Sequence, residues 1–266
     1  MVATCADAWS LSVGAAYAGS NVSLVLAVEQ ADGTPGVLKV PMPGREGEHE
    51  AAALAAWDGD GAIRLLAHDP ERHALLLERC TPGSPLSELD ADTALEVLID
   101  LLPRLWRPAG PPFTPLADEA RHWAGGLVAQ WEAAGRPCER RLVDAAVDTL
   151  AALADDPPTD GVTVLLHQDL HADNVLRAER APWLAIDPKP LVGDRAFAVA
   201  PIVRSSELGP GRDLVLRRLD RLTGELGLDR GRARRWTFAQ TMAWAFDGDT
   251  ALPGHLDVAR WVLALL

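Results

Sequence analysis

Lysine is almost absent from this sequence. Of the 25 basic residues among 266, only Lys39 and Lys189 are lysine, and the others are arginine. A lysine presents a compact ammonium charge, whereas an arginine presents a planar fork, so the two are not interchangeable at a specific site. A lysine kept in such a chain is therefore a candidate for a site that requires a point charge.

Cysteine is also scarce. Cys5, Cys80 and Cys138 show no CxxC spacing and leave one thiol unpaired, which argues against a disulfide framework or a zinc site and favours a reducing compartment. No apolar run approaches the ~20 residues that a membrane-spanning helix needs. Residues 1–7 carry no basic stretch before an apolar segment, as a signal peptide would. We therefore expect a cytoplasmic protein with a substantial core, built as one large domain or as two lobes around a cleft.

Positive charge is in deficit, and the formal net charge is −13. Such a surface repels the phosphates of nucleic acids and of anionic membranes, so we expect neither as a partner. The charge favours a cationic small molecule as ligand. It is equally compatible with acidity that serves solubility alone.

The first third of the chain alternates short apolar runs with turn signals, the pattern of β-strands. It predicts strands at residues 23–29, 37–40, 63–67 and 73–78 and a helix at residues 46–57. Two strands, a helix and two further strands make a compact α+β unit.

The rest of the chain is mostly helical, because apolar residues recur at helical spacing between Gly or Asp-Pro punctuation. The predicted helices cover residues 92–106, 116–134, 139–154, 212–226, 230–246 and 255–266. The change from β-rich to α-rich sequence falls at residues 78–85, where Thr81-Pro82-Gly83 would break either structure. We predict a domain at residues 1–80 and another at residues 81–266, a small β-rich lobe followed by a larger helical lobe.

A polar segment lies between the helices. It reads His167-Gln-Asp169-Leu-His171-Ala-Asp173-Asn174, preceded by an apolar run and followed by a short strand at residues 175–176. A further strand, predicted at residues 182–186, ends at Asp187. The pattern predicts a polar loop held between strands, with a carboxylate following closely at a strand end.

These residue types suit phosphoryl transfer from a nucleotide. That reaction needs a carboxylate to take the proton of an attacking hydroxyl, oxygen ligands for magnesium, and positive charge on the nucleotide phosphates. Asp169 supplies the carboxylate. Asn174 and Asp187 supply oxygen atoms of the kind that magnesium prefers. An isolated lysine, Lys39, lies in the β-rich lobe ahead of the motif.

Two other interpretations stay open at this point. Asp169, Asp173 and Asn174 are also common turn formers, and His167 could be a hydrogen-bonded core histidine. Alternatively, His167, Asp169 and His171 could bind the metal of a hydrolase. The hydrolase interpretation does not explain Lys39 or the two-lobe organisation.

The segment 167–174 resembles the catalytic loop of aminoglycoside phosphotransferases, which are relatives of protein kinases. The stretch Trp183-Leu-Ala-Ile-Asp-Pro-Lys-Pro-Leu-Val-Gly-Asp194 resembles more specifically the branch that contains streptomycin 6-phosphotransferases and hydroxyurea phosphotransferases, as do residues 57–66 and 75–79. The resemblance runs from about Gly14 to the last residue and is densest at residues 162–201. It implies an α+β, protein-kinase-like fold with a small β-rich N-lobe and a larger helical C-lobe.

The resemblance also implies roles for residues of the N-lobe. Lys39 would contact the phosphates of ATP and pair with Glu50 of the following helix, with Glu46 as the second choice. Ser20, in the hairpin Gly19-Ser20-Asn21, would belong to the loop that covers the phosphates. The backbone of residues 78–80, from Glu78 to Cys80, would contact adenine.

In the C-lobe, the resemblance implies that Asp169 is the catalytic base and that Asn174 and Asp187 hold Mg²⁺. Three departures from the family pattern stand nearby. Gln168 occupies a position where glycine is frequent, and we expect its side chain to point away from the cleft. Arg195 replaces a proline, and Ala198 replaces an aspartate that supports the catalytic loop, which is expected to loosen that loop.

The acceptor would lie against the last helices, where Asp247, Asp249 and Trp244 suit a guanidinium or ammonium group. The same residues are also compatible with a capped turn and a core tryptophan. Our leading hypothesis is an ATP- and magnesium-dependent kinase that phosphorylates a hydroxyl of a cationic, streptomycin-like antibiotic. The alternatives are a kinase of another small hydroxylated metabolite, such as hydroxyurea, a sugar or an amino sugar, and a nucleotide-binding pseudokinase.

Overall fold

The computed structural model of the protein describes residues 1–17, 23–42 and 44–266. It contains two compact units, each built from two stretches of the chain. The first unit is Met1–Leu86 with Asn174–Pro190, and the second is Ser87–Asp173 with Leu191–Leu266.

This division differs from the predicted domains, because residues 174–190 belong to the first unit. They form a hairpin of β8 (Val175–Arg177) and β9 (Trp183–Ala185). Ala185 bridges to Ala62, and Leu176 bridges to Pro85. These backbone pairings hold the hairpin in the first unit, although most of the helical sequence separates the hairpin from residues 1–86. A single boundary along the sequence cannot describe a unit that is built from two separate stretches of chain.

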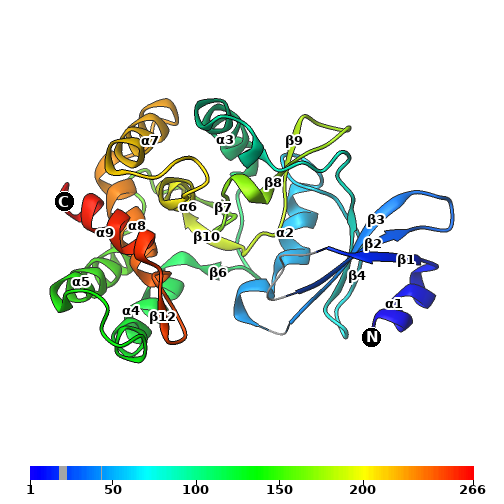
Figure 1. The fold of residues 1–266 in the computed structure, drawn as a ribbon, viewed down its shortest axis with the longest axis horizontal. Coiled ribbons are helices and arrows are strands. Elements are labelled where there is room, and N and C mark those ends of the chain that lie inside the picture. The colour runs from blue at the N-terminus through cyan, green and yellow to red at the C-terminus, as the bar shows by residue number, and fades with distance from the viewer. Residues whose placement is uncertain (18–22, 43) are drawn as a thin grey trace. The chain divides into compact units, whose positions relative to one another are not determined.

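The first unit contains an antiparallel sheet of five strands in the order β1-β2-β3-β5-β4. The strands are β1 (Ser12–Ala16), β2 (Ser23–Glu29), β3 (Pro35–Pro41), β4 (Leu65–Asp69) and β5 (Ala74–Glu78). Helices α1 (Val2–Trp9) and α2 (Glu50–Trp57) cover opposite faces of this sheet (Figure 1).

Strand β3 lies in the interior of the sheet, paired with β2 on one side and β5 on the other. Successive side chains of a strand point to opposite faces. Leu38, which is fully buried, therefore packs with Cys5 of α1 and with Leu26 and Leu76 of the neighbouring strands. Lys39, one residue further, points to the opposite face, where α2 lies.

Most predicted elements of the first unit are present with shifted ends. The predicted helix at residues 46–57 begins at Glu50 and is preceded by a short 3-10 turn, η1 (Arg45–Gly47). The last two predicted strands start one or two residues later than expected. Helix α1 was not predicted, and a strand ahead of Gly19 was expected only through the resemblance, without bounds.

The second unit is helical and contains a small three-stranded sheet in the order β6-β10-β7. Its helices are α3 (Ala91–Leu105), α4 (Leu116–Ala133), α5 (Arg140–Asp155), α6 (Ala200–Arg204), α7 (Arg212–Glu225), α8 (Arg230–Ala243) and α9 (Pro253–Leu263). Its strands are β6 (Thr114–Pro115), β7 (Thr163–Leu166), β10 (Leu191–Asp194) and the hairpin β11 (Phe246–Asp247) and β12 (Thr250–Ala251). Except for α6, the predicted helices and observed helices correspond, with α8 ending earlier because the chain turns into β11.

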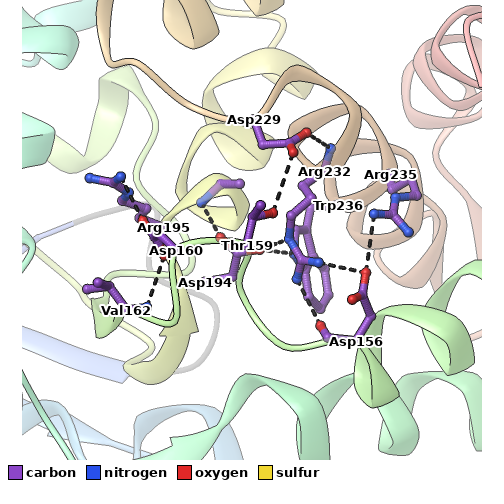
Figure 2. A network of polar contacts seen from close by, with 11 residues as sticks. Asp156, Thr159, Asp160, Val162, Asp194, Arg195, Asp229, Arg232, Arg235 and Trp236 are labelled. Atoms are coloured by element: carbon purple, nitrogen blue, oxygen red, sulfur yellow. Dashed lines mark hydrogen bonds and ion pairs between the residues drawn. The ribbon is translucent and has the colours of Figure 1, made fainter.

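Strand β10 and the 3-10 helix η4 (Arg195–Val199) are fixed by a buried ionic network (Figure 2). Asp194 accepts hydrogen bonds from Arg232 Nε at 2.6 Å and Trp236 Nε1 at 3.1 Å, and its other oxygen caps η4 through the Ala196 amide at 2.9 Å. Arg232 also donates to the Asp156 carboxylate at 2.7 Å. The network connects the start of α8 to β10 and to the end of α5.

Glycine is required at one position of this framework. A Cβ atom at Gly193 would lie 2.5 Å from Leu116 Cβ, so α4 can pack against β10 only where that strand lacks a side chain. Within the parts of the chain that the structure describes, no helix has the length and apolar character needed to cross a membrane.

Candidate active site

Lys39 is the centre of a buried charged cluster in the first unit. Its Nζ donates to both carboxylate oxygens of Glu50, at 2.8 and 2.7 Å, and also contacts the Asp187 carboxylate. Lys39 is 6% exposed and Glu50 is 2% exposed, so this is not a surface lysine on an edge strand. The structure therefore brings together the predicted residues Lys39, Glu50 and Asp187, from β3, α2 and the segment after β9.

The electrostatics of this cluster depend on both carboxylates. Burial lowers the pKa of Lys39, but the charges of Glu50 and Asp187 outweigh burial and raise that pKa above its ordinary value. Burial raises the pKa of Glu50, with Lys39 acting in the opposite direction. Lys189, the second lysine of the chain, also acts on Glu50 through its charge. The cluster therefore holds an ammonium group in place and keeps it charged.

Asn174 and Asp187 lie at the two ends of the β8–β9 hairpin. Asn174 precedes β8, and the Ile186 amide, just ahead of Asp187, donates to the Asn174 carbonyl at 2.9 Å. Asp187 has a left-handed backbone with φ of 55°, which is uncommon outside glycine. Left-handed residues of this kind concentrate at functional sites. The hairpin thus brings the backbones of residues 174 and 186 together in the first unit.

Asp169 lies in the second unit, in the loop that follows β7. It is 7% exposed, and its Oδ1 accepts a hydrogen bond from Arg204 Nη2 at 3.1 Å. Arg204 is itself buried, and its guanidinium stacks on the Trp244 ring at 4.3 Å from the ring centre. The His255 ring nitrogen Nδ1 lies 2.7 Å from the Trp244 carbonyl. The predicted catalytic carboxylate is therefore oriented by an arginine that the sequence did not point to.

A second pair lies beside Asp169. His171 Nδ1 lies 2.7 Å from Glu207 Oε1, and His171 Nε2 lies 4.0 Å from Asp169 Oδ2. Burial lowers the pKa of His171, but the hydrogen bond to Glu207 and the nearby carboxylates raise that pKa overall. The other Glu207 oxygen accepts from the Asp173 amide at 3.0 Å. Glu207 therefore fixes both the ring of His171 and the backbone of the loop.

The metal-ion arrangement expected for a hydrolase is not observed. Among the described residues, the His, Cys, Asp and Glu side chains close enough to share an ion are His171, Asp173 and Glu207, and this group does not include His167 or Asp169. These three groups already bond with one another or with their neighbours, as Asp173 does with the Ser87 hydroxyl.

A cavity of about 450 Å³ opens at Asp169. Its wall includes three carboxylates and one guanidinium, which belong to Asp169, Glu207, Asp257 and Arg204. Three carboxylates against one guanidinium give the wall net negative charge, which a protonated His171 would reduce but not cancel. Leu252, Pro253 and Trp261 supply apolar surface in the same cavity. Such a combination of apolar walls with a few polar groups is typical of a small-molecule site.

The other predicted nucleotide contacts involve Ser20, Glu78 and Cys80. Ser20 lies outside the described residues, and the side chain of Glu46 is not described either. The Glu78 carboxylate binds Arg180 at 2.8 and 2.9 Å, so its side chain has a structural role. The Cys80 thiol is half-buried, and burial raises its pKa to about 12. The expected contact of this segment with adenine would use backbone atoms and stays a prediction.

The candidate acceptor residues near the end of the chain do not assemble into a site. Asp247 and Asp249 lie exposed on the β11–β12 hairpin and do not line the cavity. Trp244 instead supports Arg204. Gln168, at the position where glycine was expected, has a left-handed backbone with φ of 66° and is 3% exposed. Its side chain does not line the cavity.

Comparison with known proteins identifies the relatives of this architecture. Residues 8–248 match the family model described as aminoglycoside/hydroxyurea antibiotic resistance kinase. The chain is 40% identical to a streptomycin 6-kinase of Streptomyces griseus, over 98% of this chain and 87% of the relative. It is 42% identical to a hydroxyurea phosphotransferase of Kitasatospora aureofaciens, over 95% of this chain and 74% of the relative.

The fold is similar to that of a choline kinase from Streptococcus pneumoniae, with a TM-score of 0.69 at 13% identity and 99% of both chains covered. The predicted α+β, kinase-like fold is confirmed by this similarity, and the predicted branch is confirmed by the two relatives.

Proposed function

The chain belongs to the family of aminoglycoside/hydroxyurea antibiotic resistance kinases, and we propose that it transfers the terminal phosphoryl group of ATP to a hydroxyl of a streptomycin-like aminoglycoside. The observation that carries this proposal is the buried Lys39–Glu50 pair, which reaches Asp187. Burying a lysine and a carboxylate together is costly unless the charges are paired. A fixed ammonium group of this kind suits the phosphates of a nucleotide.

Magnesium fits the residues present. Asn174 offers an amide oxygen and Asp187 a carboxylate oxygen, which are hard ligands of the type Mg²⁺ selects. The hydrogen bond from Ile186 to the Asn174 carbonyl keeps the two ends of the hairpin together. Magnesium held there would offset negative charge on the transferring phosphoryl group. Glu50 would in turn hold Lys39 in position for the phosphates.

Asp169 is the proposed base. It lines the cavity, where its carboxylate would accept the proton of the acceptor hydroxyl as that oxygen attacks phosphorus. Arg204 fixes the orientation of this carboxylate through Oδ1. The raised pKa of His171, held by Glu207, favours a positive charge near the point where phosphoryl oxygens would approach. Preoriented charges of this kind stabilise the transition state more than the substrate.

The cavity favours an aminoglycoside over hydroxyurea as the acceptor. The two relatives are nearly equally similar to this chain, so identity does not distinguish their substrates. A cavity of about 450 Å³ lies in the range that drug-sized ligands occupy, whereas hydroxyurea has only a few heavy atoms and would leave most of it unfilled. Glu207 and Asp257 on its wall also suit guanidinium and ammonium groups.

The test is an acceptor panel with ATP and magnesium. Purified protein is incubated with streptomycin, other aminoglycosides, hydroxyurea and sugars, with ADP release and product mass as readouts. We expect phosphorylated streptomycin, and we expect Asp169→Asn to abolish turnover while ATP binding is kept. Asp148→Asn, an exposed aspartate on α5, is the matched control and should be active.

Three outcomes would contradict parts of the proposal. Phosphorylated hydroxyurea without any aminoglycoside product would replace the acceptor. ATP binding without ADP release for every acceptor would favour the pseudokinase. Retained turnover in Asp169→Asn would remove Asp169 from the mechanism.

A further inference from the structure

We propose that Gln240 of α8 is a positioning residue for catalysis, because it holds the loop before Asp169 in a left-handed conformation through the carbonyl of Gln168. This inference rests on the proposed role of Asp169 as the base. Gln240 lies 71 positions beyond Asp169 in the sequence, and no motif of the sequence points to it.

The loop needs support at this point. Gln168 has φ of 66°, and a residue with a Cβ atom is disfavoured there because the side chain approaches its own backbone. The position directly precedes Asp169, so a rotation of the 168–169 peptide would turn the catalytic carboxylate away from Arg204 and the cavity. A strained conformation of this kind persists only where the surroundings determine it.

Gln240 supplies a contact of the required type. Its Nε2 donates to the Gln168 carbonyl at 3.0 Å, and both residues are buried, at 0% and 3% exposure. A carbonyl can only accept hydrogen bonds, so the amide nitrogen must face it. The orientation of the Gln240 side chain is therefore fixed by the loop.

The identity of this residue is not explained by packing. Gln240 lies in a stretch of α8 whose other buried residues include Phe238, Ala239 and Met242. An amide buried there loses its hydration, and an apolar side chain would pack without that loss. Within the described residues, the Gln240 Oε1 and Gln168 Nε2 atoms have no hydrogen-bond partner. The hydrogen bond to the Gln168 carbonyl is thus the contact that favours an amide side chain at position 240.

The helix that carries Gln240 is itself well anchored. Asp229 caps its first turn by accepting from the Arg232 amide at 2.9 Å, and Arg232 binds the buried Asp194. Ala198, the position at which a loop-supporting aspartate was missing, is buried and offers no polar side-chain atom. Support for the loop comes instead from α8, two turns beyond its ionic anchor.

The experiment combines a change at 240 with changes at 168. Gln240→Met keeps the length of the side chain and removes the donor. In wild-type background it should lower kcat by up to about 100-fold, the loss that a catalytic group misplaced by about 1 Å can cause. The KM for ATP should stay near the wild-type value, because the proposed nucleotide contacts are made by residues of the first unit.

Glycine at 168 separates positioning from general stability. Glycine adopts positive φ without steric cost, so Gln168→Gly should restore most of the kcat that Gln240→Met removes. Gln168→Ala, the matched control, has a Cβ atom and should not restore it. Unchanged kcat in Gln240→Met would overturn the proposal. The proposal would also be overturned if Gln240→Met lowered kcat equally whether residue 168 is glutamine or glycine.

Hydrogen–deuterium exchange at the backbone amides of residues 168–171 provides a readout that does not need turnover. Exchange should be faster in Gln240→Met and return toward the wild-type rate when Gln168→Gly is added. If the wild-type protein phosphorylates no acceptor, the proposed function fails, and this exchange measurement still decides the role of Gln240. Identical exchange in wild type and Gln240→Met would refute it.

Discussion

The buried pair of Lys39 and Glu50 allows stability to be separated from activity. Replacing Lys39 by methionine removes the ammonium group and leaves the Glu50 carboxylate, which is 2% exposed, without its closest cation. Removing one partner of a buried pair costs about 3–5 kcal/mol of unfolding free energy, whereas replacing both by apolar residues is often close to neutral. We therefore expect Lys39→Met to be strongly destabilised and Lys39→Met/Glu50→Leu to recover most of that loss.

Asp187 makes the two single changes unequal. In Glu50→Leu, Lys39 keeps the Asp187 carboxylate as a partner, and the Asp187 side chain is 40% exposed. Glu50→Leu should therefore cost less than Lys39→Met. Both single variants and the double variant should lose about 100- to 1,000-fold in kcat, the size of effect seen when one charge-stabilising group is removed from an active site.

The pH dependence gives a further check on the same pair. The pKa of Glu50 is already raised by burial, and loss of Lys39 would raise it more. A carboxyl group with a raised pKa in the folded state favours folding at low pH, and this contribution is lost as pH rises through the folded-state pKa. The instability of Lys39→Met relative to wild type should therefore be smaller at pH 5 than at pH 8.

Stability is measured by urea unfolding, with the fluorescence of the nine tryptophans as the signal, and activity is measured by steady-state ADP release. The reasoning is refuted if the double variant is as unstable as Lys39→Met, because the cost would then not arise from an unpaired buried charge. It is also refuted if the double variant keeps wild-type turnover, since Lys39 would then have no role at the phosphates.

Two other predictions concern the second unit. Asp194→Asn should destabilise the protein by up to about 3–5 kcal/mol, because the Arg232 guanidinium loses its buried carboxylate partner and keeps only the half-exposed Asp156 carboxylate. Asp156→Asn is the milder control in the same urea titrations. The hydrogen bond from Arg260 lowers the pKa of Glu139 to about 2, but that side chain is 40% exposed, so Glu139→Gln should cost no more than about 1 kcal/mol. A lowered carboxyl pKa stabilises the fold at pH values above the ordinary pKa of 4.5, and this stabilisation is lost as pH falls toward 2. The urea unfolding midpoints of wild type and Glu139→Gln should therefore converge in acid. A difference that grows in acid would contradict the assignment.

The predicted fold followed from local sequence patterns, and it departs from the structure where contacts between distant segments decide. The strand at residues 23–29 and most helices were predictable because apolar spacing and turn residues act over a few positions. The return of residues 174–190 to the first unit was not predictable, because short backbone bridges to Ala62 and Pro85 determine it. Pairings between distant segments leave no periodic signal in one sequence.

The candidate site likewise has a part that is predictable from local sequence and a part that depends on contacts between distant segments. The sequence alone identified Asp169, Asn174 and Asp187 as candidate site residues, because all three lie in one short segment. It identified Lys39 through the scarcity of lysine. Only the tertiary structure decided which partners orient them. Arg204 and Gln240 lie 35 and 72 positions from the loop residues that they bind, and a hydrogen bond made across such a distance depends on how helices pack rather than on the residues beside it in the chain.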